Sequence, residues 1–203
     1  MLIMDIRTDS RILVVGKTGS GKTVFVKNVL WPMYPRKVFH DIKLDNNNIP
    51  HTFLAKTPGQ LKEALTKGHN AILYQPADID TGDFNKVCEI VFNAGNICLF
   101  VDEAADVCSS SQIEPYHRKI MTRGRSRGVG IVNCSQRPRM VYNAIISEAE
   151  HFFIFRLFLS TDRDKLKQGL PGELLEQAQS LPPFHYIYAD LNDNVKMMTP
   201  IKL

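Results

Sequence analysis

Long apolar runs are missing from this chain of 203 residues, and no uncharged stretch approaches the roughly 18 apolar residues of a membrane-spanning helix. The first residues, Met1 to Asp5, also lack the basic and long apolar regions of a secretory signal peptide. Internal repeats are absent, and the only biased tract is the short run from Asn46 to Asn48. We therefore expect no transmembrane segment, no signal peptide, and a single domain over residues 1–203.

Cysteine is scarce and is not spaced for metal binding. The chain has four cysteines, Cys88, Cys98, Cys108 and Cys134, and their spacing matches neither a zinc motif nor a disulfide framework. Cys98 and Cys134 lie inside apolar runs, where cysteine is usually a small core residue. This pattern favours a reducing compartment and a fold without cross-links.

Acidic residues are absent from Pro115 to Ser147, although the whole chain is only mildly basic, with a net charge of +4. The segment carries basic residues at Arg118, Lys119, Arg123, Arg125, Arg127, Arg137 and Arg139. Such a local excess is typical of a surface that faces nucleic-acid phosphates. A solvated helix face with one or two catalytic arginines explains it equally well, so both interpretations stay open.

Apolar, strand-like runs alternate with helix-like segments along the chain. We expect strands over 11–15, 37–41, 70–75, 97–101, 129–134 and 151–157, and a closing hairpin of 184–189 and 195–198. Helices are expected over 23–30, from 58, after a cap at Thr81 or Asp83, over 114–123, over 162–168 and over 172–179, with turns at Trp31-Pro32 and Tyr34-Pro35 and an irregular polar stretch up to Thr57. This alternation predicts an α/β fold with a mainly parallel sheet flanked by helices, which binds its ligand at the carboxyl ends of the strands.

The most specific motif of the chain follows the first expected strand. Its residues are Gly16, Lys17, Thr18, Gly19, Ser20, Gly21, Lys22 and Thr23, which fit the phosphate-binding P-loop G-x-x-x-x-G-K-[ST] at every fixed position. The glycines let backbone N–H groups converge on a phosphate at the start of a helix that continues into Val24. Lys22 then reaches the β- and γ-phosphates, and the Thr23 hydroxyl ligates Mg²⁺. The sequence therefore predicts a nucleoside triphosphate site with Mg²⁺.

A second motif predicts what happens to the triphosphate. Asp102 and Glu103 directly follow the apolar run 97–101, which is a Walker B pattern with an adjacent glutamate. Asp102 would hold Mg²⁺, directly or through a water, and Glu103 would orient or activate the attacking water. We therefore predict hydrolysis of the bound triphosphate.

The next expected strand, 129–134, leads to a third group of residues. An amide at that strand end, Gln136, can hydrogen-bond the γ-phosphate or the attacking water. The spacing of Arg125, Gly128 and the run Gln136-Arg137-Pro138 resembles the FtsK–HerA superfamily of DNA-pumping ATPases. Further similarity lies in Phe155-Arg156-Leu157, in Asp162 with Lys165-Leu166, and in Asp41-Ile42-Lys43, so that the resemblance spans about residues 10 to 190.

The resemblance implies a fold and a working unit. The runs 37–41 and 70–75 intervene between the P-loop strand and the Walker B strand, and with the adjacent glutamate they resemble the additional-strand, RecA-like branch of P-loop ATPases. In that superfamily an arginine from one subunit completes the ATP site of its neighbour in a ring. By position, Arg125 is the first candidate for this arginine, and Arg123 and Arg127 are the reserves.

The resemblance also implies a role. The chain is nearly a bare motor core, which is similar to the genome-packaging ATPases of tailless icosahedral viruses with internal membranes; an archaeal virus is one candidate source. It implies ATP and Mg²⁺, double-stranded DNA, a homo-oligomeric ring (a hexamer or a pentamer), and a capsid portal or membrane-protein partner. The expected location is the host cytoplasm or the virion during assembly.

Three other functions fit parts of the sequence. A small P-loop nucleoside or nucleotide kinase would use the segment Arg118 to Arg127 as a phosphate-clamping lid, but such kinases do not usually carry Asp-Glu after the apolar strand. A GTPase-type switch is disfavoured, because Asn85-Lys86 lacks the following Asp that reads guanine. A ring motor of the same superfamily acting on single-stranded DNA or protein also stays open.

Overall fold

The structure is a computed structural model that describes residues 6–77, 82–191 and 194–198. Its strands are β1 (Arg11–Val15), β2 (Lys37–His40), β3 (Phe53–Ala55), β4 (Ala71–Tyr74), β5 (Ile97–Val101), β6 (Val129–Ser135), β7 (His151–Ile154), β8 (Tyr186–Asp190) and β9 (Val195–Met198). Its helical segments are α1 (Lys22–Phe25), η1 (Val26–Leu30), α2 (Trp31–Met33), α3 (Pro58–Thr66), α4 (Gly82–Ala94), α5 (Ala104–Val107), α6 (Pro115–Arg123), η2 (Gly124–Arg127), η3 (Pro138–Met140), α7 (Asn143–Ser147), α8 (Ser160–Leu166) and α9 (Gly172–Gln177).

The strands form one sheet in the order β3-β4-β2-β5-β6-β1-β7-β8-β9. In this order, all neighbouring strands as far as β7 pair in parallel, whereas β7–β8 and β8–β9 are antiparallel. The C-terminal hairpin of β8 and β9 therefore forms one edge of the sheet. Every residue of β5 and β6 is buried, as expected for central parallel strands covered on both faces. The predicted fold class, an α/β sheet with a closing hairpin, is confirmed.

The strand inserted between the P-loop strand β1 and the Walker B strand β5 is β6. It pairs with β1 on one side and with β5 on the other. The runs near 37–41 and 70–75, which suggested an extra strand, become β2 and β4 on the far side of β5. The additional-strand architecture is therefore present, but the inserted strand comes later in the chain than those two runs.

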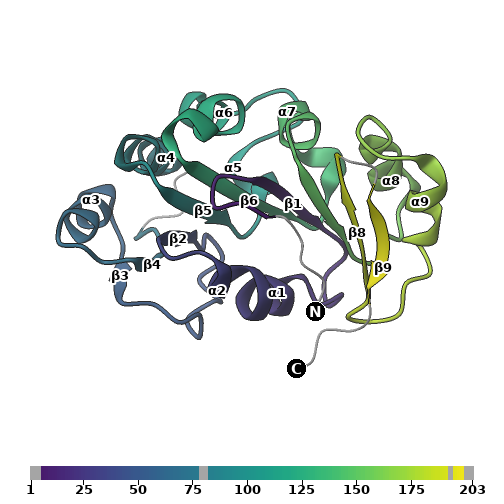
Figure 1. Cartoon of the computed structure of the whole chain (residues 1–203), viewed down its shortest axis with the longest axis horizontal. Coiled ribbons are helices and arrows are strands. Elements are labelled where there is room, and N and C mark those ends of the chain that lie inside the picture. The colour runs from purple at the N-terminus through teal and green to yellow at the C-terminus, as the bar shows by residue number, and fades with distance from the viewer. Residues whose placement is uncertain (1–5, 78–81, 192–193, 199–203) are drawn as a thin grey trace.

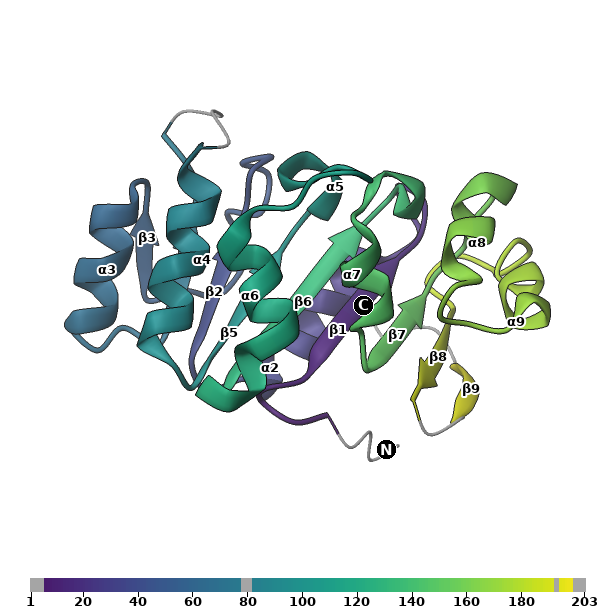
Figure 2. The ribbon, with the colours of Figure 1, turned by 90° about the horizontal axis from the view of Figure 1, so that it is seen from above.

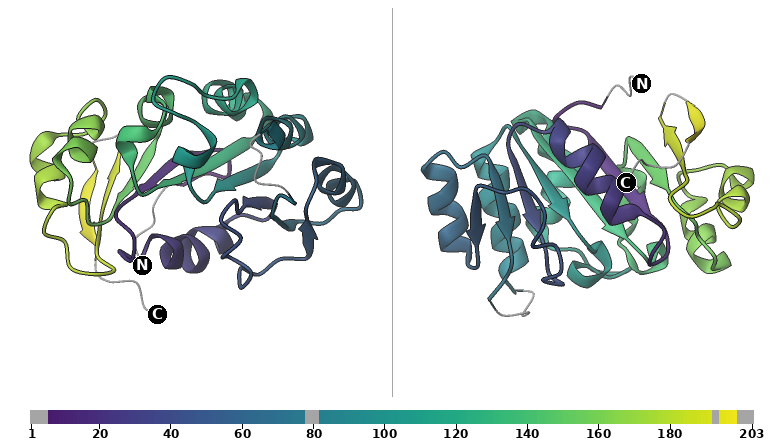
Figure 3. Two further views of the ribbon diagram at one scale, coloured as in Figure 1. Left: turned by 180° about the vertical axis from the view of Figure 1, so that it is seen from behind. Right: turned by 90° about the horizontal axis from the view of Figure 1, so that it is seen from below.

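Helices cover both faces of the sheet (Figure 1). The helices α3, α4, α6 and α7 lie over one face (Figure 2), and the helix that begins after the P-loop lies across the other (Figure 3, right). Three buried core clusters fill the space between these helices and the sheet. In the first, Leu61, Val87 and Ile120 pack with Leu99; in the second, Phe25 and Trp31 pack with Ile12 and Phe100; in the third, Ile145, Leu166 and Leu174 pack with Leu13 and Phe152. These cores leave the carboxyl ends of the parallel strands to carry the polar side chains described below.

The expected turn at Trp31-Pro32 is wrong, because the helix after the P-loop continues to Met33. The middle of this helix, η1, is a π-helical stretch, and Pro32 follows in the first turn of α2. Pro32 has no backbone N–H to continue the hydrogen-bond ladder, and the helix ends one residue later, at Met33. The buried Trp31 ring packs edge-on against Phe39 and Phe100, and these contacts keep the extra turn on the sheet.

The irregular stretch expected up to Thr57 contains a short edge strand, β3, which pairs with β4. Three residues are too few to show an alternating pattern, and only Ala55 among them is buried. The sequence therefore contains no signal for this strand. Smaller corrections concern boundaries: β7 ends at Ile154 rather than Leu157, and Asp83 lies in the first turn of α4 rather than before it. Thr81 lies outside the described residues.

Candidate functional site

The P-loop connects β1 to α1 at the carboxyl edge of the sheet, and its backbone requires glycine at two positions. At Gly21 the φ angle is +106°, and an added Cβ would lie 2.8 Å from the ring of Phe184. At Gly16 an added Cβ would lie 2.5 Å from the Cβ of Phe155. A side chain at either position would displace the loop, so these glycines fix its course around a phosphate.

Lys22 lies across the inside of the P-loop. Its Nζ donates to the carbonyl oxygens of Gly16 at 2.6 Å and Lys17 at 3.1 Å. Burial lowers the pKa of this ammonium group. Thr23 is exposed and Val24 half-buried at the start of the same helix, where N–H groups and a hydroxyl are open to a phosphate and its cation. The Ser20 hydroxyl donates to the Lys17 carbonyl at 2.7 Å and stabilises the loop. The arrangement fits the roles predicted for the P-loop residues.

Gln136 connects the P-loop to the Walker B strand. It follows β6, which lies between β1 and β5, so its backbone and side chain face opposite neighbours. Its backbone N–H donates to both carboxylate oxygens of Glu103, at 3.2 and 3.1 Å. Its side-chain Oε1 accepts the hydroxyl of Thr18 at 2.5 Å. The structure thus brings together three groups that are distant in the sequence: Gln136 lies 33 positions from Glu103 and 118 from Thr18.

An acidic group surrounds Asp102 at the end of β5. The carboxylates of Asp41, Asp45 and Asp102 each offer an oxygen within 4.8 Å of the others. Burial, followed by the negative charge of Asp41, raises the pKa of Asp102 to about 6. Carboxylate oxygens in this arrangement match the ligand preference of Mg²⁺, and a divalent cation would offset their mutual repulsion. The residues present therefore fit a magnesium ion beside the P-loop.

Lys43 is a further charged group in this site. The sequence indicated no chemical role for it and only included it in the run Asp41-Ile42-Lys43, which resembles the FtsK–HerA superfamily. Its Nζ lies 3.4 Å from Oε2 of Glu103 and 4.0 Å from a carboxylate oxygen of Asp106. Burial alone would lower its pKa, but Glu103, Asp102 and Asp106 outweigh that effect and leave the pKa raised. Lys43 follows β2, which pairs in parallel with β5, and parallel strands end at the same edge of the sheet. This position is the one sequence signal that could have indicated the contact between Lys43 and Glu103.

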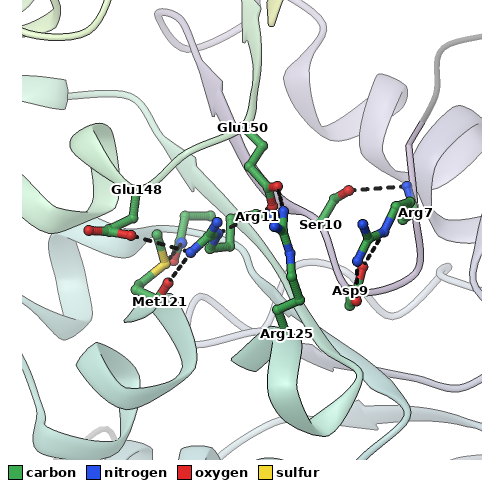
Figure 4. Close-up of polar contacts among 9 residues, drawn as sticks. Arg7, Asp9, Ser10, Arg11, Met121, Arg125, Glu148 and Glu150 are labelled. Atoms are coloured by element: carbon green, nitrogen blue, oxygen red, sulfur yellow. Dashed lines mark hydrogen bonds and ion pairs between the residues drawn. The ribbon is translucent and has the colours of Figure 1, made fainter. Parts of the chain in front are cut away.

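Arg125 lies on η2, at the amino end of β6 and therefore at the opposite edge of the sheet from this chain's own P-loop. Its guanidinium pairs with Glu150, whose other carboxylate oxygen accepts the Nε of Arg11 at 3.2 Å (Figure 4). Of the two reserves, Arg127 donates to the carbonyl of Asn93, and Arg123 is exposed. The structure thus separates all three arginines from the site within one subunit.

Arg137 and Arg139 follow Gln136 and belong to the basic segment from Pro115 to Ser147, which the sequence assigns either to a DNA-facing surface or to a solvated helix face with one or two catalytic arginines. The Nε of Arg137 lies 3.4 Å from the buried carboxylate of Asp162, which also accepts the backbone N–H of Arg139 at 3.1 Å. Arg137 lines a cavity of about 120 Å³ together with Lys17, Thr18, Gln136 and the segment from Leu157 to Leu159. The side chain of Arg137 therefore lies on the nucleotide side of the molecule.

A parallel sheet with β6 between the P-loop and Walker B strands, together with Lys22 and the pair Asp102-Glu103, defines a RecA-like P-loop ATPase. No protein-family model matches the chain. The chain is homologous to the DNA packaging ATPase P9 of Enterobacteria phage PRD1, with 29% identity over 213 residues that cover 94% of this chain and 87% of P9.

Two solved structures show how widely this fold occurs. The genome packaging NTPase B204 from Sulfolobus turreted icosahedral virus 2, in complex with AMPPCP, matches with a TM-score of 0.82 and 17% identity, covering 97% of this chain and all of B204. The bacterial conjugative coupling protein TrwB matches with a TM-score of 0.68 and 12% identity, covering 97% of this chain and 86% of that chain. The resemblance to viral genome-packaging ATPases that the sequence indicated is confirmed.

Among the helices of the described ranges, none is long and apolar enough to cross a membrane.

Proposed function

We propose that this protein is an ATP-driven double-stranded DNA translocase that packages a viral genome into a preformed capsid, with one ATPase domain over residues 1–203. The observation that carries the proposal is the junction at Gln136, which connects a complete P-loop to a buried Walker B glutamate in a homologue of a DNA packaging ATPase. Such a junction couples the state of the γ-phosphate to the group that activates water.

Each residue of the site has a role in hydrolysis. Lys22 leaves the loop carbonyls to contact the β- and γ-phosphates, while the N–H groups from Gly16 to Val24 surround the phosphate chain. Glu103 accepts a proton from the attacking water or orients that water toward the γ-phosphate. Gln136 is close enough to both sides to contact the γ-phosphate or the attacking water, and it reports their presence to Glu103.

Thr23 and Asp102 would hold Mg²⁺. When bound there, the ion would neutralise negative charge on the triphosphate. Thr23 is exposed at the start of α1, and Asp102 is half-buried at the end of β5 with two further carboxylates beside it. Burial lowers the pKa of Lys22, and the negative charges of Glu103 and Asp102 raise it by less.

The working unit is a homo-oligomeric ring of five or six subunits. Arg125 projects from the sheet edge opposite the P-loop, so a head-to-tail contact can carry it to the neighbouring subunit's ATP. A guanidinium there would stabilise the charge that develops on the transferring phosphoryl group. Reaching that position requires Arg125 to exchange Glu150 for the neighbour's phosphate.

The DNA-facing surface is assigned to the basic segment that begins at α6. Arg118, Lys119 and Arg123 line one hollow on the outer side of this helix. Contacts to phosphates rather than bases fit a motor that must move along any sequence, so binding should weaken with salt. A capsid portal or a membrane protein at the vertex would anchor the ring, in the host cytoplasm or on the assembling virion.

The kinase alternative loses its main support in the structure. The segment expected to form its lid, Arg118 to Arg127, is part of α6 and η2, which pack on the sheet and end at the edge opposite the P-loop. A lid must instead close over the bound phosphates. This geometry favours hydrolysis over phosphoryl transfer to a second substrate.

The proposal is tested by titrating the protein with duplex DNA while phosphate release and the mass of the assembled oligomer are measured. We expect Mg²⁺-dependent release that rises with DNA length and with assembly. An absence of hydrolysis at every DNA, Mg²⁺ and protein concentration would refute the proposal. Transfer of phosphate to a nucleoside or nucleotide would instead identify a kinase.

A further inference from the structure

Glu103 is a buried carboxylate, and within the described part of the chain Lys43 is the one cation that forms an ion pair with it, while Lys22 acts on it from a greater distance. Its side chain is 5% exposed, and besides the Gln136 N–H it contacts the Nζ of Lys43, 3.4 Å from Oε2. Asp102 and Asp106 lie nearby with like charge and repel this carboxylate. Burial strengthens these forces, because water screens them less than at the surface. The position of the Glu103 carboxylate therefore depends on Lys43.

The turn that carries Lys43 is built rigidly. Asp41, fully buried at its start, accepts the backbone N–H and the side-chain amide of Asn46 at 3.0 and 2.8 Å, and the amide of Gln75 at 2.9 Å. Leu44, next to Lys43, has a φ angle of +59°, in the left-handed region that side chains other than glycine seldom adopt. Strain of this kind persists only where surrounding contacts hold it, and it concentrates at functional sites.

We propose that Lys43 is a positioning residue for Glu103: its ammonium group holds the carboxylate against the Gln136 N–H and away from Asp102, ready to receive the attacking water. This inference rests on the proposed ATPase function and deepens it. Lys43 acts through Glu103 and not on the triphosphate. Its removal should therefore slow turnover without weakening nucleotide binding, because a misplaced catalytic group costs rate rather than affinity.

The test compares Lys43→Met and Lys43→Arg with a matched control, Lys67→Met. Lys67 forms an exposed ion pair with Glu63 on α3, so its loss should change nothing measurable. For Lys43→Met we expect kcat to fall by roughly 10- to 100-fold, as for a displaced catalytic group. The dissociation constant for an ATP analogue and the melting temperature should stay near those of the unmodified protein. Lys43→Arg, which keeps the charge, should recover most of the lost rate.

A double-mutant comparison isolates the route of the effect. If Lys43 acts only by positioning Glu103, then Lys43→Met should cause no further loss in a Glu103→Gln background, because contacting residues are non-additive. An equal fold-loss in both backgrounds, a selective rise in KM, or faster turnover of Lys43→Met would each overturn the inference. Inactive unmodified protein would overturn the proposed function instead. Active unmodified protein with an equally active Lys43→Met variant would overturn only the role of Lys43.

Discussion

Gln136 donates its backbone N–H to both carboxylate oxygens of Glu103, at 3.2 and 3.1 Å. The same residue accepts the hydroxyl of Thr18 through its side chain, so one residue connects the P-loop with the proposed water-activating group. We propose that a change in the P-loop on nucleotide binding or phosphate release reaches Glu103 through this one residue, and that this connection couples nucleotide state to movement in the proposed motor.

Replacing Gln136 tests that connection. The variant Gln136→Ala keeps the backbone N–H to Glu103 but removes the amide that accepts the Thr18 hydroxyl and that we propose contacts the γ-phosphate. We expect kcat to fall by roughly 10²-fold, the cost of losing one donor at a developing charge, while ATP binding changes little. The exposed Gln112 provides a matched control, because Gln112→Ala removes the same group from a surface loop. An equal loss of binding and turnover in Gln136→Ala would contradict the sensor role.

Glu103→Gln should separate nucleotide binding from hydrolysis. The amide still accepts the Gln136 N–H but cannot take a proton, so we expect phosphate release to fall by about 10²- to 10⁴-fold. ATP should remain bound and intact on the variant, which is measurable by filter binding followed by chromatography of the retained nucleotide. Glu173→Gln, on the exposed face of α9, is the control. Normal turnover by Glu103→Gln would remove Glu103 from the mechanism.

Mixing inactive variants tests the trans arginine. Lys22→Ala and Arg125→Ala should each be inactive as homogeneous rings, the first for lack of the phosphate lysine and the second for lack of the neighbour's guanidinium. In mixed rings some interfaces combine an intact Lys22 with an intact Arg125, so phosphate release should return. The same experiment with Arg127→Ala serves as a comparison. Recovery only with Arg127→Ala would transfer the role to Arg127, and no recovery with any of the arginine variants would argue against a shared site.

The response to pH should reflect Asp102. Its pKa of about 6 lies above its ordinary value of 3.8, so between these values the folded protein keeps a proton that the unfolded chain has lost. Without Mg²⁺ the free energy of unfolding should therefore fall as the pH rises from about 4 to 6. Magnesium favours the carboxylate, so its stabilising effect should be large above pH 6 and fade below it.

Melting curves with and without Mg²⁺ between pH 4 and pH 8 check this expectation. Asp102→Asn should abolish both the pH dependence contributed by this group and most of the stabilisation by the ion. A stabilisation by Mg²⁺ that is the same at every pH, or unchanged in Asp102→Asn, would place the ion elsewhere.

The sequence predicted much of this architecture because its signals are local. The P-loop glycines, the apolar run 97–101 and the pair Asp102-Glu103 identify themselves within a few residues, and the strands they predict are present. The order of those strands depends on crossovers between distant segments, so the placement of β6 between β1 and β5 could not be predicted from spacing. The contacts of Lys43 with Glu103 and of Arg125 with Glu150 depend on that order, and neither has a local signature.

The central claim is that ATP hydrolysis at this site moves double-stranded DNA, and displacement of a third strand from a duplex tests it most directly. A triplex-forming oligonucleotide bound to linear duplex DNA is released when a motor passes along the duplex, and the release is followed by gel or fluorescence. With ATP and Mg²⁺ we predict displacement by the unmodified protein and none by Glu103→Gln at equal DNA occupancy. Hydrolysis of ATP by the assembled protein on that duplex, with the third strand left in place, would contradict the account.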